Sequence, residues 1–424
     1  MKVAIVGGGY AGMAAAAELA ARGMTVDVFE ASRILGGRAR AVELDGVTVD
    51  NGAHILAGAY GETLRLMAVV GAEPDRQLAR RPLHLEFPGR FRLAAPRLPA
   101  PWHLAWALLT ARGIGLTEKV AALHFMEGVK RRRYRLDGDR PVAQLLDEFR
   151  QSANLRRHLW EPLCVAALNT PAASASAQVF LNVLRDSLAA EASASDLLLP
   201  ATDLSSLFPE PAAGYVEAHG GRVLRERRVK TIEAAVDGFR LDRELDYDQV
   251  IIAVAPQHLP PLLAALPALA PVATKAAAFA FEPIVTVYLA YPQAVSLPLP
   301  MVGVADGIAQ WVFDRGRLCA QPGLLAAVIS AHGGHEEMDH ATLAERVHRD
   351  IAALVPGLPS PRWSRVIAEK RATFACTPGL IRPRTVTALP GLLLAGDYVA
   401  GDYPATLEGA VRSGVAAAKA VLGN

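Results

Sequence analysis

The chain has 424 residues, of which 52% are hydrophobic and 20% are charged. This length predicts two or three domains of roughly 150 residues each, and the apolar composition provides for a large buried core. Because 44 Lys and Arg residues are balanced by 42 Asp and Glu residues, the net charge is only +2, and we expect no general positive field for nucleic acid.

Several other classes of protein are disfavoured. No run of about 18 uncharged apolar residues occurs, so we expect no transmembrane helix. The first residues form an apolar strand rather than a charged region with a cleavable apolar segment, which predicts a cytoplasmic protein without a signal peptide. Cys164, Cys319 and Cys376 are far apart and form no C-x-x-C pair, so we expect buried thiols rather than disulfides or a thiolate metal site.

The first 30 residues predict a strand, a tight turn, a helix and a second strand. Residues 7–12 read GGGYAG and match G-x-G-x-x-G at Gly7, Gly9 and Gly12. The first glycine permits the turn, the second lets the backbone approach a pyrophosphate, and the third allows close packing of helix on strand. The helix N-terminus then offers free N–H groups and a positive dipole end to the phosphates.

Glu30 lies at the end of the second strand, where a carboxylate can bond both hydroxyls of an adenosine ribose and repels a 2′-phosphate. The segment therefore predicts dinucleotide binding and disfavours NADP; the alternative is an ordinary strand, turn and helix. Residues 82–211 and 271–384 carry no second G-x-G-x-x-G, so we expect no separate nicotinamide domain.

Two further segments have residues suited to a planar ligand. In Gly36-Gly37-Arg38 the glycines let the backbone lie flat while the guanidinium offers a fork to a pyrophosphate or a flavin edge. A surface turn with a solvated arginine explains this segment equally well. Residues 49–54 (VDNGAH) follow a short hairpin, and the small Gly52 and Ala53 indicate backbone close to a planar ring. His54 fits that site or a hydrogen-bonded position in the core.

Residues 98–135 contain two tryptophans in an apolar stretch, followed by a run of basic residues. Trp102 and Trp106 lie in an apolar helix, and residues 130–135 read KRRRYR. Tryptophan favours the headgroup level of a membrane and basic residues favour anionic lipid, which predicts a docking surface for the inner face of a membrane. The alternative is an internal helical pair with one solvated basic end. Nucleic-acid binding is disfavoured because few aromatic residues alternate with the cations.

A cluster at residues 332–340 (HGGHEEMDH) has residue types that bind zinc. Its glycines and acids fit better a loop that enters a helix over 341–354, and we expect no metal.

The C-terminal segment completes a pattern. Residues 392–418 read LLLAGDYVAGDYPATLEGAVRSGVAAA: a strand, a Gly-Asp pair, a loop and a helix of small residues. Together with GGGYAG, Glu30, GGRAR and DNGAHIL, in this order, they resemble the FAD-dependent amine oxidases and phytoene desaturases. The resemblance implies an FAD cofactor and an α/β fold, in which a discontinuous Rossmann-type FAD-binding domain carries an inserted substrate domain of mixed sheet and helices.

The resemblance also implies the domain ranges and the roles of residues. The FAD-binding domain is expected at 1–81, 212–270 and 385–424, and the substrate domain at 82–211 and 271–384. In such proteins the aspartate of the Gly-Asp pair binds the ribityl chain, and the last helix directs its N-terminus at the flavin pyrimidine, whose negative charge on reduction a helix dipole stabilises. The expected cofactor-binding residues are Gly7, Gly9, Ala11, Gly12, Glu30, Gly37, Arg38, Gly52, Ala53, His54, Val229, Ala253, Gly396, Asp397, Thr406 and Leu407.

Residues 160–171 (WEPLCVAALNTP), with GDYPATLEGAVRSG, resemble one branch of that superfamily, the hydroxysqualene dehydroxylases. This implies removal of the hydroxyl of hydroxysqualene in squalene and hopanoid biosynthesis, with hydride passing from flavin N5 to an allylic cation. The partners implied are a C30 isoprenoid and upstream squalene-pathway synthases that hand it over. Asp402, Glu408 and His54 are the expected general acids, because hydroxide is a poor leaving group.

Two alternatives stay open, and a third is disfavoured. A polyisoprenoid desaturase of the squalene or phytoene type would run hydride in the opposite direction. A prenyl-lipid carrier on the same fold would do no redox work. An amine oxidase is disfavoured because the lysine-flanked aromatic cage of that branch cannot be located in the sequence.

Overall fold

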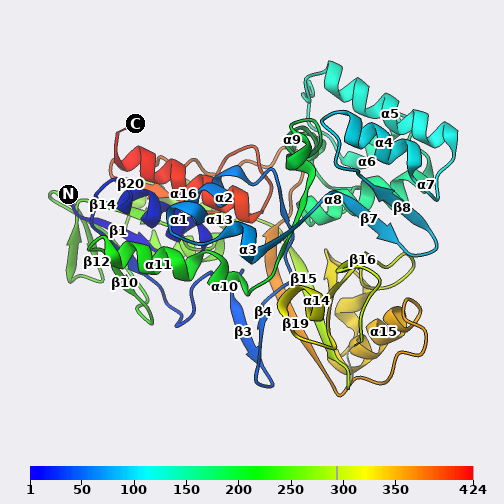
Figure 1. Ribbon diagram of the computed structural model, residues 1–424. Coiled ribbons are helices and arrows are strands. Elements are labelled where there is room, and N and C mark those ends of the chain that lie inside the picture. The colour runs from blue at the N-terminus through cyan, green and yellow to red at the C-terminus, as the bar shows by residue number, and fades with distance from the viewer. Residues whose placement is uncertain (293–294, 424) are drawn as a thin grey trace.

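A five-stranded parallel sheet carries the N-terminal glycine motif (Figure 1). The computed structural model describes residues 1–292 and 295–423. The strands come from separated stretches of the chain and lie in the order β10-β2-β1-β14-β20, with β1 Val3–Val6, β2 Val26–Phe29, β10 Arg222–Leu224, β14 Gln249–Ile252 and β20 Leu392–Leu394.

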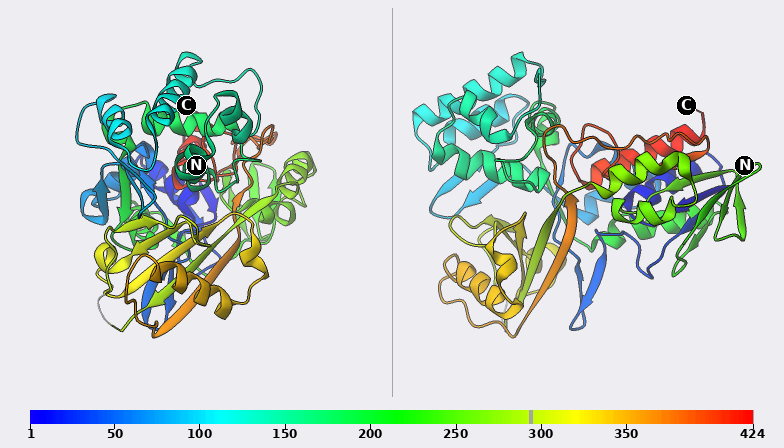
Figure 2. Two further views of the ribbon diagram at one scale, coloured as in Figure 1. Left: turned by 90° about the vertical axis from the view of Figure 1, so that its right-hand side faces the viewer. Right: turned by 180° about the vertical axis from the view of Figure 1, so that it is seen from behind.

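Successive residues of these strands face opposite layers, as strand geometry requires. Val3 and Ile5 pack with the helices α1 (Tyr10–Ala20), α11 (Pro209–Ala218) and α16 (Leu407–Val421). On the other side, Phe29 meets Tyr247 edge to face at 6.0 Å between ring centroids. Tyr247 belongs to an antiparallel sheet of β11 (Ile232–Ala235), β12 (Gly238–Leu241) and β13 (Leu245–Tyr247), which covers that face (Figure 2).

Helices α1 and α16 lie in close contact although they come from opposite ends of the chain. Every residue of α1 is buried. A Cβ atom at Gly414 of α16 would lie 2.1 Å from the Ala11 carbonyl oxygen. The small residues of both helices therefore have a packing reason, which offsets their low helix propensity.

A second sheet, entirely antiparallel, forms the lower right of Figure 1. Its order is β16-β17-β18-β15-β19, with β15 Phe281–Ala290, β16 Met301–Gly303, β17 Trp311–Asp314, β18 Leu324–Ser330 and β19 Trp363–Phe374. Val285 and Val287 face α15 (His340–Ala352), which covers one side. Ile284 and Tyr288 alternate with them and pack on the opposite side.

A helical unit stands above this sheet in Figure 1. It contains α4 Trp102–Thr110, α5 Leu116–Arg131, α6 Val142–Glu148, α8 Glu161–Leu168 and α9 Ala177–Leu188, beside the hairpin of β7 His84–Phe87 and β8 Phe91–Ala94. Trp160 is buried against Phe125 at 4.7 Å between centroids and donates its indole N–H to Gln151 Oε1 at 2.8 Å. Within the described ranges, every helix is too short or too polar to cross a bilayer.

The predicted fold class is confirmed: a Rossmann-type sheet is combined with an inserted unit of sheet and helices. Helix α11 spans the predicted division at 211/212, and Leu204 and Leu207 of α10 (Leu204–Leu207) pack in the same core. We therefore propose that the chain rejoins the first domain before α10.

Candidate active site

A cavity of about 910 Å³ lies where the parallel sheet, the five-stranded antiparallel sheet and α8 meet. It is lined by every residue expected to bind the cofactor except Gly12. The structure thus brings together segments from both ends and from the middle of the chain.

The surroundings of each glycine in the loop show whether protein packing or the cavity accounts for its missing side chain. At Gly7, where φ is +115°, it would lie 2.7 Å from the Ala253 carbonyl oxygen, and at Gly12 it would lie 1.9 Å from the Gly7 oxygen. At Gly9 it would meet nothing nearer than 3.8 Å. Protein packing therefore explains Gly7 and Gly12, whereas the space beside Gly9 belongs to the cavity. Helix α1 starts at Tyr10 with no side-chain cap, so its N-terminal N–H groups suit a pyrophosphate.

Glu30 faces the same end of the cavity. Its carboxylate accepts hydrogen bonds from the backbone N–H groups of Gly8 and Ser32, both at 2.7 Å. Because each carboxylate oxygen has two acceptor positions, capacity remains for the hydroxyls of a ribose. The basic residues Arg227 and Arg228 precede Val229 at this end, and sequence reasoning gave them no role.

Arg38 joins three segments of the site. Its Nη2 lies 2.6 Å from Asp397 Oδ1, and its Nη1 donates to the Ala372 carbonyl at 2.6 Å. Both terminal nitrogens of the guanidinium that we expected to face a pyrophosphate or flavin edge donate to the protein, while Arg38 also lines the cavity, so that role stays a prediction. Asp397 is buried and held at the cavity wall by this pair.

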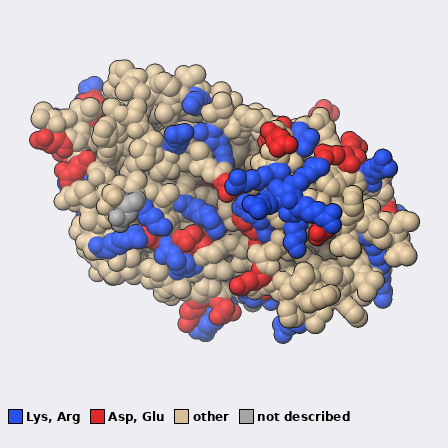
Figure 3. All heavy atoms as spheres, turned by 90° about the horizontal axis from the view of Figure 1, so that it is seen from above, with Lys and Arg blue, Asp and Glu red and all other residues tan. Residues whose placement is uncertain are grey.

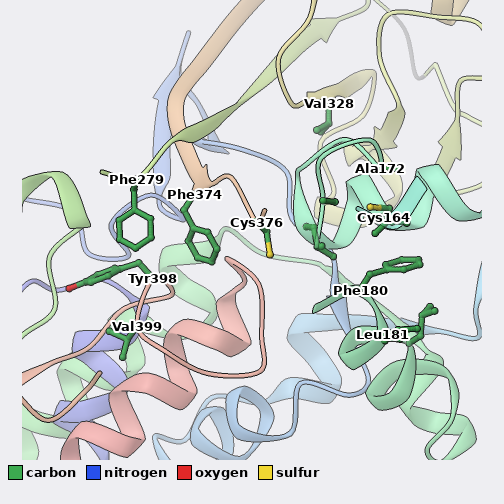
Figure 4. Packing of buried hydrophobic residues seen from close by; sticks show 14 of the residues in the cluster. Cys164, Ala172, Phe180, Leu181, Phe279, Val328, Phe374, Cys376, Tyr398 and Val399 are labelled. Atoms are coloured by element: carbon green, nitrogen blue, oxygen red, sulfur yellow. The ribbon is translucent and has the colours of Figure 1, made fainter. Parts of the chain in front are cut away.

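The wall beside Asp397 is fixed by aromatic packing (Figure 4). Tyr398 lies edge to face with Phe279 at 6.3 Å between centroids, and Phe279 contacts Phe374 at 5.9 Å. Cys164 and Cys376 belong to the same apolar cluster, where burial raises the pKa of both thiols far above the ordinary value. Cys319 is only half-buried, which corrects the expectation for that residue.

Buried polar contacts hold the loop at residues 50–54. Asp50 accepts from the Leu204 N–H at 2.7 Å and pairs with Arg315 at 3.2 Å, while its carbonyl accepts from the Tyr288 hydroxyl at 2.7 Å. Burial raises the pKa of Asp50 to about 6, although Arg315 opposes that rise. These contacts anchor the loop to the antiparallel sheet.

His54 is the one expected general acid that lines the cavity. Its Nδ1 lies 2.7 Å from the Gly52 carbonyl oxygen, which can only accept, so Nδ1 carries the proton and Nε2 of the neutral ring is an acceptor. Burial, followed by the positive charge of Arg38, lowers the pKa of His54 below its usual value.

The other two candidates lie outside the cavity lining, and this is a correction. Glu408 is fully buried, and its carboxylate accepts from the Thr63 N–H at 3.0 Å and from Arg412 Nε at 2.7 Å. It stabilises the N-terminus of α2 (Gly61–Val69) rather than facing a substrate. Asp402 has a side chain that is 70% exposed and lies 3.6 Å from Arg185.

The N-terminus of α16 does face the cavity, through Thr406, Leu407 and Ala410. Thr406 caps the helix by accepting from the Gly409 N–H at 3.1 Å. The positive end of a helix of 15 residues is thereby directed at the expected position of the flavin pyrimidine.

The far end of the cavity is mostly apolar. Its lining residues come from α8 and from the antiparallel sheet: Val165, Ala166, Ala167, Ile284, Trp311, Phe313 and Val328. Asn169 ends α8 in a left-handed conformation with φ of 45°. It donates to Thr373 Oγ1 at 3.0 Å and accepts from the Ala331 N–H at 2.9 Å, so the segment 160–171 is fixed to β19 and to the residue that follows β18. Glu369 of β19 is a carboxylate at this end that sequence reasoning missed.

The histidine cluster at 332–340 has local partners. His332 pairs with Glu336 at 2.7 Å, and Asp339 caps α15 by accepting from the N–H groups of Ala341 and Thr342. Residues 1–292 and 295–423 contain no group of three or more side chains placed to hold a metal ion.

Comparison with known proteins agrees with this geometry. The sequence model of a family described as "Flavin containing amine oxidoreductase" matches residues 10–422. The chain is 28% identical to the hydroxysqualene dehydroxylase of Sinorhizobium fredii, covering 99% of this chain and 98% of that protein. It is 25% identical to the zeta-carotene desaturase of Synechocystis, covering 100% of this chain and 98% of that protein.

Among solved structures, a putative protoporphyrinogen oxidase from Exiguobacterium superposes with a TM-score of 0.71 at 18% identity, covering 100% of this chain and 99% of that chain. This likeness concerns the fold alone.

Proposed function

Because the chain belongs to the family of flavin-containing amine oxidoreductases and is an FAD-dependent oxidoreductase, we propose that it removes the hydroxyl group of hydroxysqualene to give squalene. The observation that carries the proposal is the composition of the cavity: one end has the dinucleotide loop, and the other is apolar. A C30 isoprenoid fits such a lining because apolar side chains both bind the chain and exclude water.

The reaction has a simple balance. The allylic C–O bond breaks, the hydroxyl takes up a proton and leaves as water, and the carbon gains a hydride. Reduced FAD would supply that hydride, and an external two-electron donor would restore the reduced state. The residues that would hold FAD are those of the glycine loop, Glu30, Asp397 and the N-terminus of α16.

We propose that His54 handles the leaving group. Its Nε2 is the ring atom left free by the Nδ1 contact with Gly52. In the neutral ring this atom accepts a hydrogen bond and so orients the hydroxyl; in the protonated ring it donates the proton.

A polyisoprenoid desaturase is the second candidate, since zeta-carotene desaturases are also relatives of the chain. One experiment separates the two directions. The holoprotein is reduced anaerobically with dithionite and mixed with hydroxysqualene, while the flavin absorbance is followed and the lipid is extracted. Reoxidation with stoichiometric squalene supports the dehydroxylase. Bleaching of the oxidised protein by squalene or phytoene would support the desaturase.

A non-redox prenyl-lipid carrier is tested by the same preparation. Such a protein would bind the isoprenoid with no change in the flavin absorbance in either redox state. Purification without bound FAD would also count for the carrier.

The proposal includes docking of the protein to an anionic lipid surface by α4 and α5. Seven of the exposed large hydrophobic residues lie in this region: Leu98, Trp102, Trp106, Leu109, Leu116, Val120 and Leu123. Trp102 and Leu116 are 66% and 73% exposed. In α4 the residues Trp102, Trp106 and Leu109, and in α5 the residues Leu116, Val120 and Leu123, are spaced by four and three positions, which places each set on one face of its helix.

Basic residues lie at the C-terminal end of α5. Figure 3 looks down on the side that carries α5 and shows Lys and Arg side chains gathered there. Lys130, Arg133 and Arg135 are exposed and form no ion pair with any other described residue. Charge complementarity thus favours a lipid surface with anionic headgroups, from which a water-insoluble substrate or an upstream synthase could deliver the isoprenoid.

A further inference from the structure

Three carboxylates line the cavity, and they differ in how they are satisfied. Glu30 accepts two backbone hydrogen bonds of 2.7 Å, and Asp397 pairs with Arg38 at 2.6 Å. Glu369 has only long contacts with the described residues: Asn51 Nδ2 at 3.4 Å and the Arg371 N–H at 3.3 Å. It is half-buried and forms no ion pair within residues 1–292 and 295–423. Most of its acceptor positions are therefore open to a ligand in the cavity.

The position of Glu369 is set by the antiparallel sheet. It is the register partner of Ile284 in the pairing of β19 with β15. Partners of this kind point to the same face of a sheet with Cβ atoms roughly 5 Å apart. Because Ile284 also lines the apolar end of the cavity, the carboxylate lies among the side chains expected to hold the hydrocarbon.

The same strand connects Glu369 to the flavin wall. The Ala372 carbonyl, three residues along β19, accepts from Arg38, which in turn holds Asp397. Asn51 contacts Glu369 from the loop that carries His54. Glu369 is therefore connected through Asn51 to the loop of His54 and through β19 to the Arg38–Asp397 pair.

We propose that the Glu369 carboxylate is the counter-charge for the allylic cation of the substrate. This inference rests on the proposed function. When the C–O bond breaks, its electron pair stays with oxygen, which takes a proton from another group and leaves as water; the carbon becomes cationic until hydride arrives. Glu369 gains and loses no proton and forms no bond. A negative charge at this position, with the hydrocarbon itself excluding water, would stabilise the developing positive charge.

The test uses the holoenzyme and an analogue in which a tertiary ammonium replaces the allylic carbon of a C30 isoprenoid. Glu369→Gln retains the shape of the side chain and removes its charge. We expect Glu369→Gln to bind the ammonium analogue at least tenfold more weakly than the unmodified enzyme, and squalene equally well, by equilibrium dialysis. The kcat for hydroxysqualene should fall by about 10²-fold with KM unchanged, as for loss of one preorganised electrostatic contact.

Glu345→Gln, an exposed change on α15, is the matched control and should alter neither measurement. Equal binding of the ammonium analogue by both enzymes would overturn the inference. So would loss of bound FAD or of squalene binding in Glu369→Gln, because a structural role would then explain the defect. If the unmodified enzyme discriminates the ammonium through Glu369 but does not turn over hydroxysqualene, the cation site stands and the proposed substrate fails.

Discussion

Arg38 and Asp397 are 359 residues apart in the chain and 2.6 Å apart in the folded protein. One guanidinium thereby joins the N-terminal glycine segment to the aspartate of the C-terminal flavin motif, and its second nitrogen reaches β19 at Ala372. The orientation of Asp397, the residue that we expect to bind a ribityl chain, thus depends on a residue from the other end of the sequence.

Arg38→Lys should weaken FAD binding roughly 10- to 100-fold, because a lysine cannot reach Asp397 and Ala372 together and charged hydrogen bonds contribute about 1.5–3 kcal/mol. Titration of the apoprotein with FAD, followed by flavin fluorescence, measures the change. Arg76→Lys, at an exposed pair with Glu73, is the control. Unchanged affinity in Arg38→Lys would show that Asp397 is held by other contacts.

Alanine substitutions at two glycines of the GGGYAG motif should give two different defects. Gly12→Ala should lower the free energy of unfolding by about 3 kcal/mol or more, because its Cβ would lie 1.9 Å from the Gly7 oxygen. Gly9→Ala should leave the apoprotein folded and weaken FAD binding at least about tenfold, since its Cβ would occupy space expected to hold the pyrophosphate. Thermal unfolding with and without FAD distinguishes them; normal FAD affinity in Gly9→Ala would contradict the assignment.

Glu408→Gln should lower the free energy of unfolding by about 3 kcal/mol, because the amide loses the charge that pairs with Arg412 and places an NH2 donor against donors at one of the two oxygen positions. Denaturant unfolding of the apoprotein measures this. Asp402→Asn, at an exposed position, should change stability and turnover little. A large loss of kcat in Asp402→Asn with FAD still bound would restore Asp402 as a candidate acid.

The free energy of unfolding should depend on pH through the protonation of His54. Its folded pKa is lowered by burial, so the unfolded chain binds the proton more tightly. The associated stability is present above the ordinary histidine pKa of about 6.5 and is lost as pH falls through the folded value. His54→Gln, which can still donate to Gly52, should therefore lose less stability than the unmodified protein between about pH 7 and pH 5. Parallel pH profiles of the melting temperature for both proteins would contradict this.

Removal of the two exposed tryptophans should weaken lipid binding. Trp102→Ser combined with Trp106→Ser should reduce sedimentation with vesicles that contain anionic phospholipid, since the indoles favour the headgroup level. Val236→Ser, at a residue that is 99% exposed outside this face, is the control.

Charge can be tested separately at the same face. Replacing Lys130, Arg133 and Arg135 by Gln should lower binding to anionic vesicles by roughly 10²-fold, at about 1 kcal/mol for each cation. Binding to neutral vesicles should change little. Equal sedimentation of all variants would remove the docking surface from the proposed function.

The sequence was most informative where function depends on local backbone geometry. Gly7, Gly9 and Gly12 are close in the chain, and the turn that they form requires no knowledge of the rest of the fold. The same holds for the start of α16, where a threonine cap and small residues mark the helix.

It was least informative where a side chain acts through long-range pairing. Glu369 lies in a strand with no motif, and only its register with Ile284 places it at the cavity. Glu408 was predicted as a general acid because it lies close to the start of the helix expected to face the flavin, yet one step along an α-helix turns the side chain by roughly 100°. Leu407 faces the cavity, whereas Glu408 turns to α2.

The parallel sheet has a consequence for synthesis on the ribosome. Strand β14 pairs with β1 on one side and with β20 on the other. Until β20 and α16 have emerged, one edge of β14 stays unpaired and the side of α1 that meets Gly414 is uncovered. The nucleotide-binding loop, translated first, thus gains its complete support last, and nascent chains that stop before residue 392 expose a strand edge open to aggregation or to chaperones.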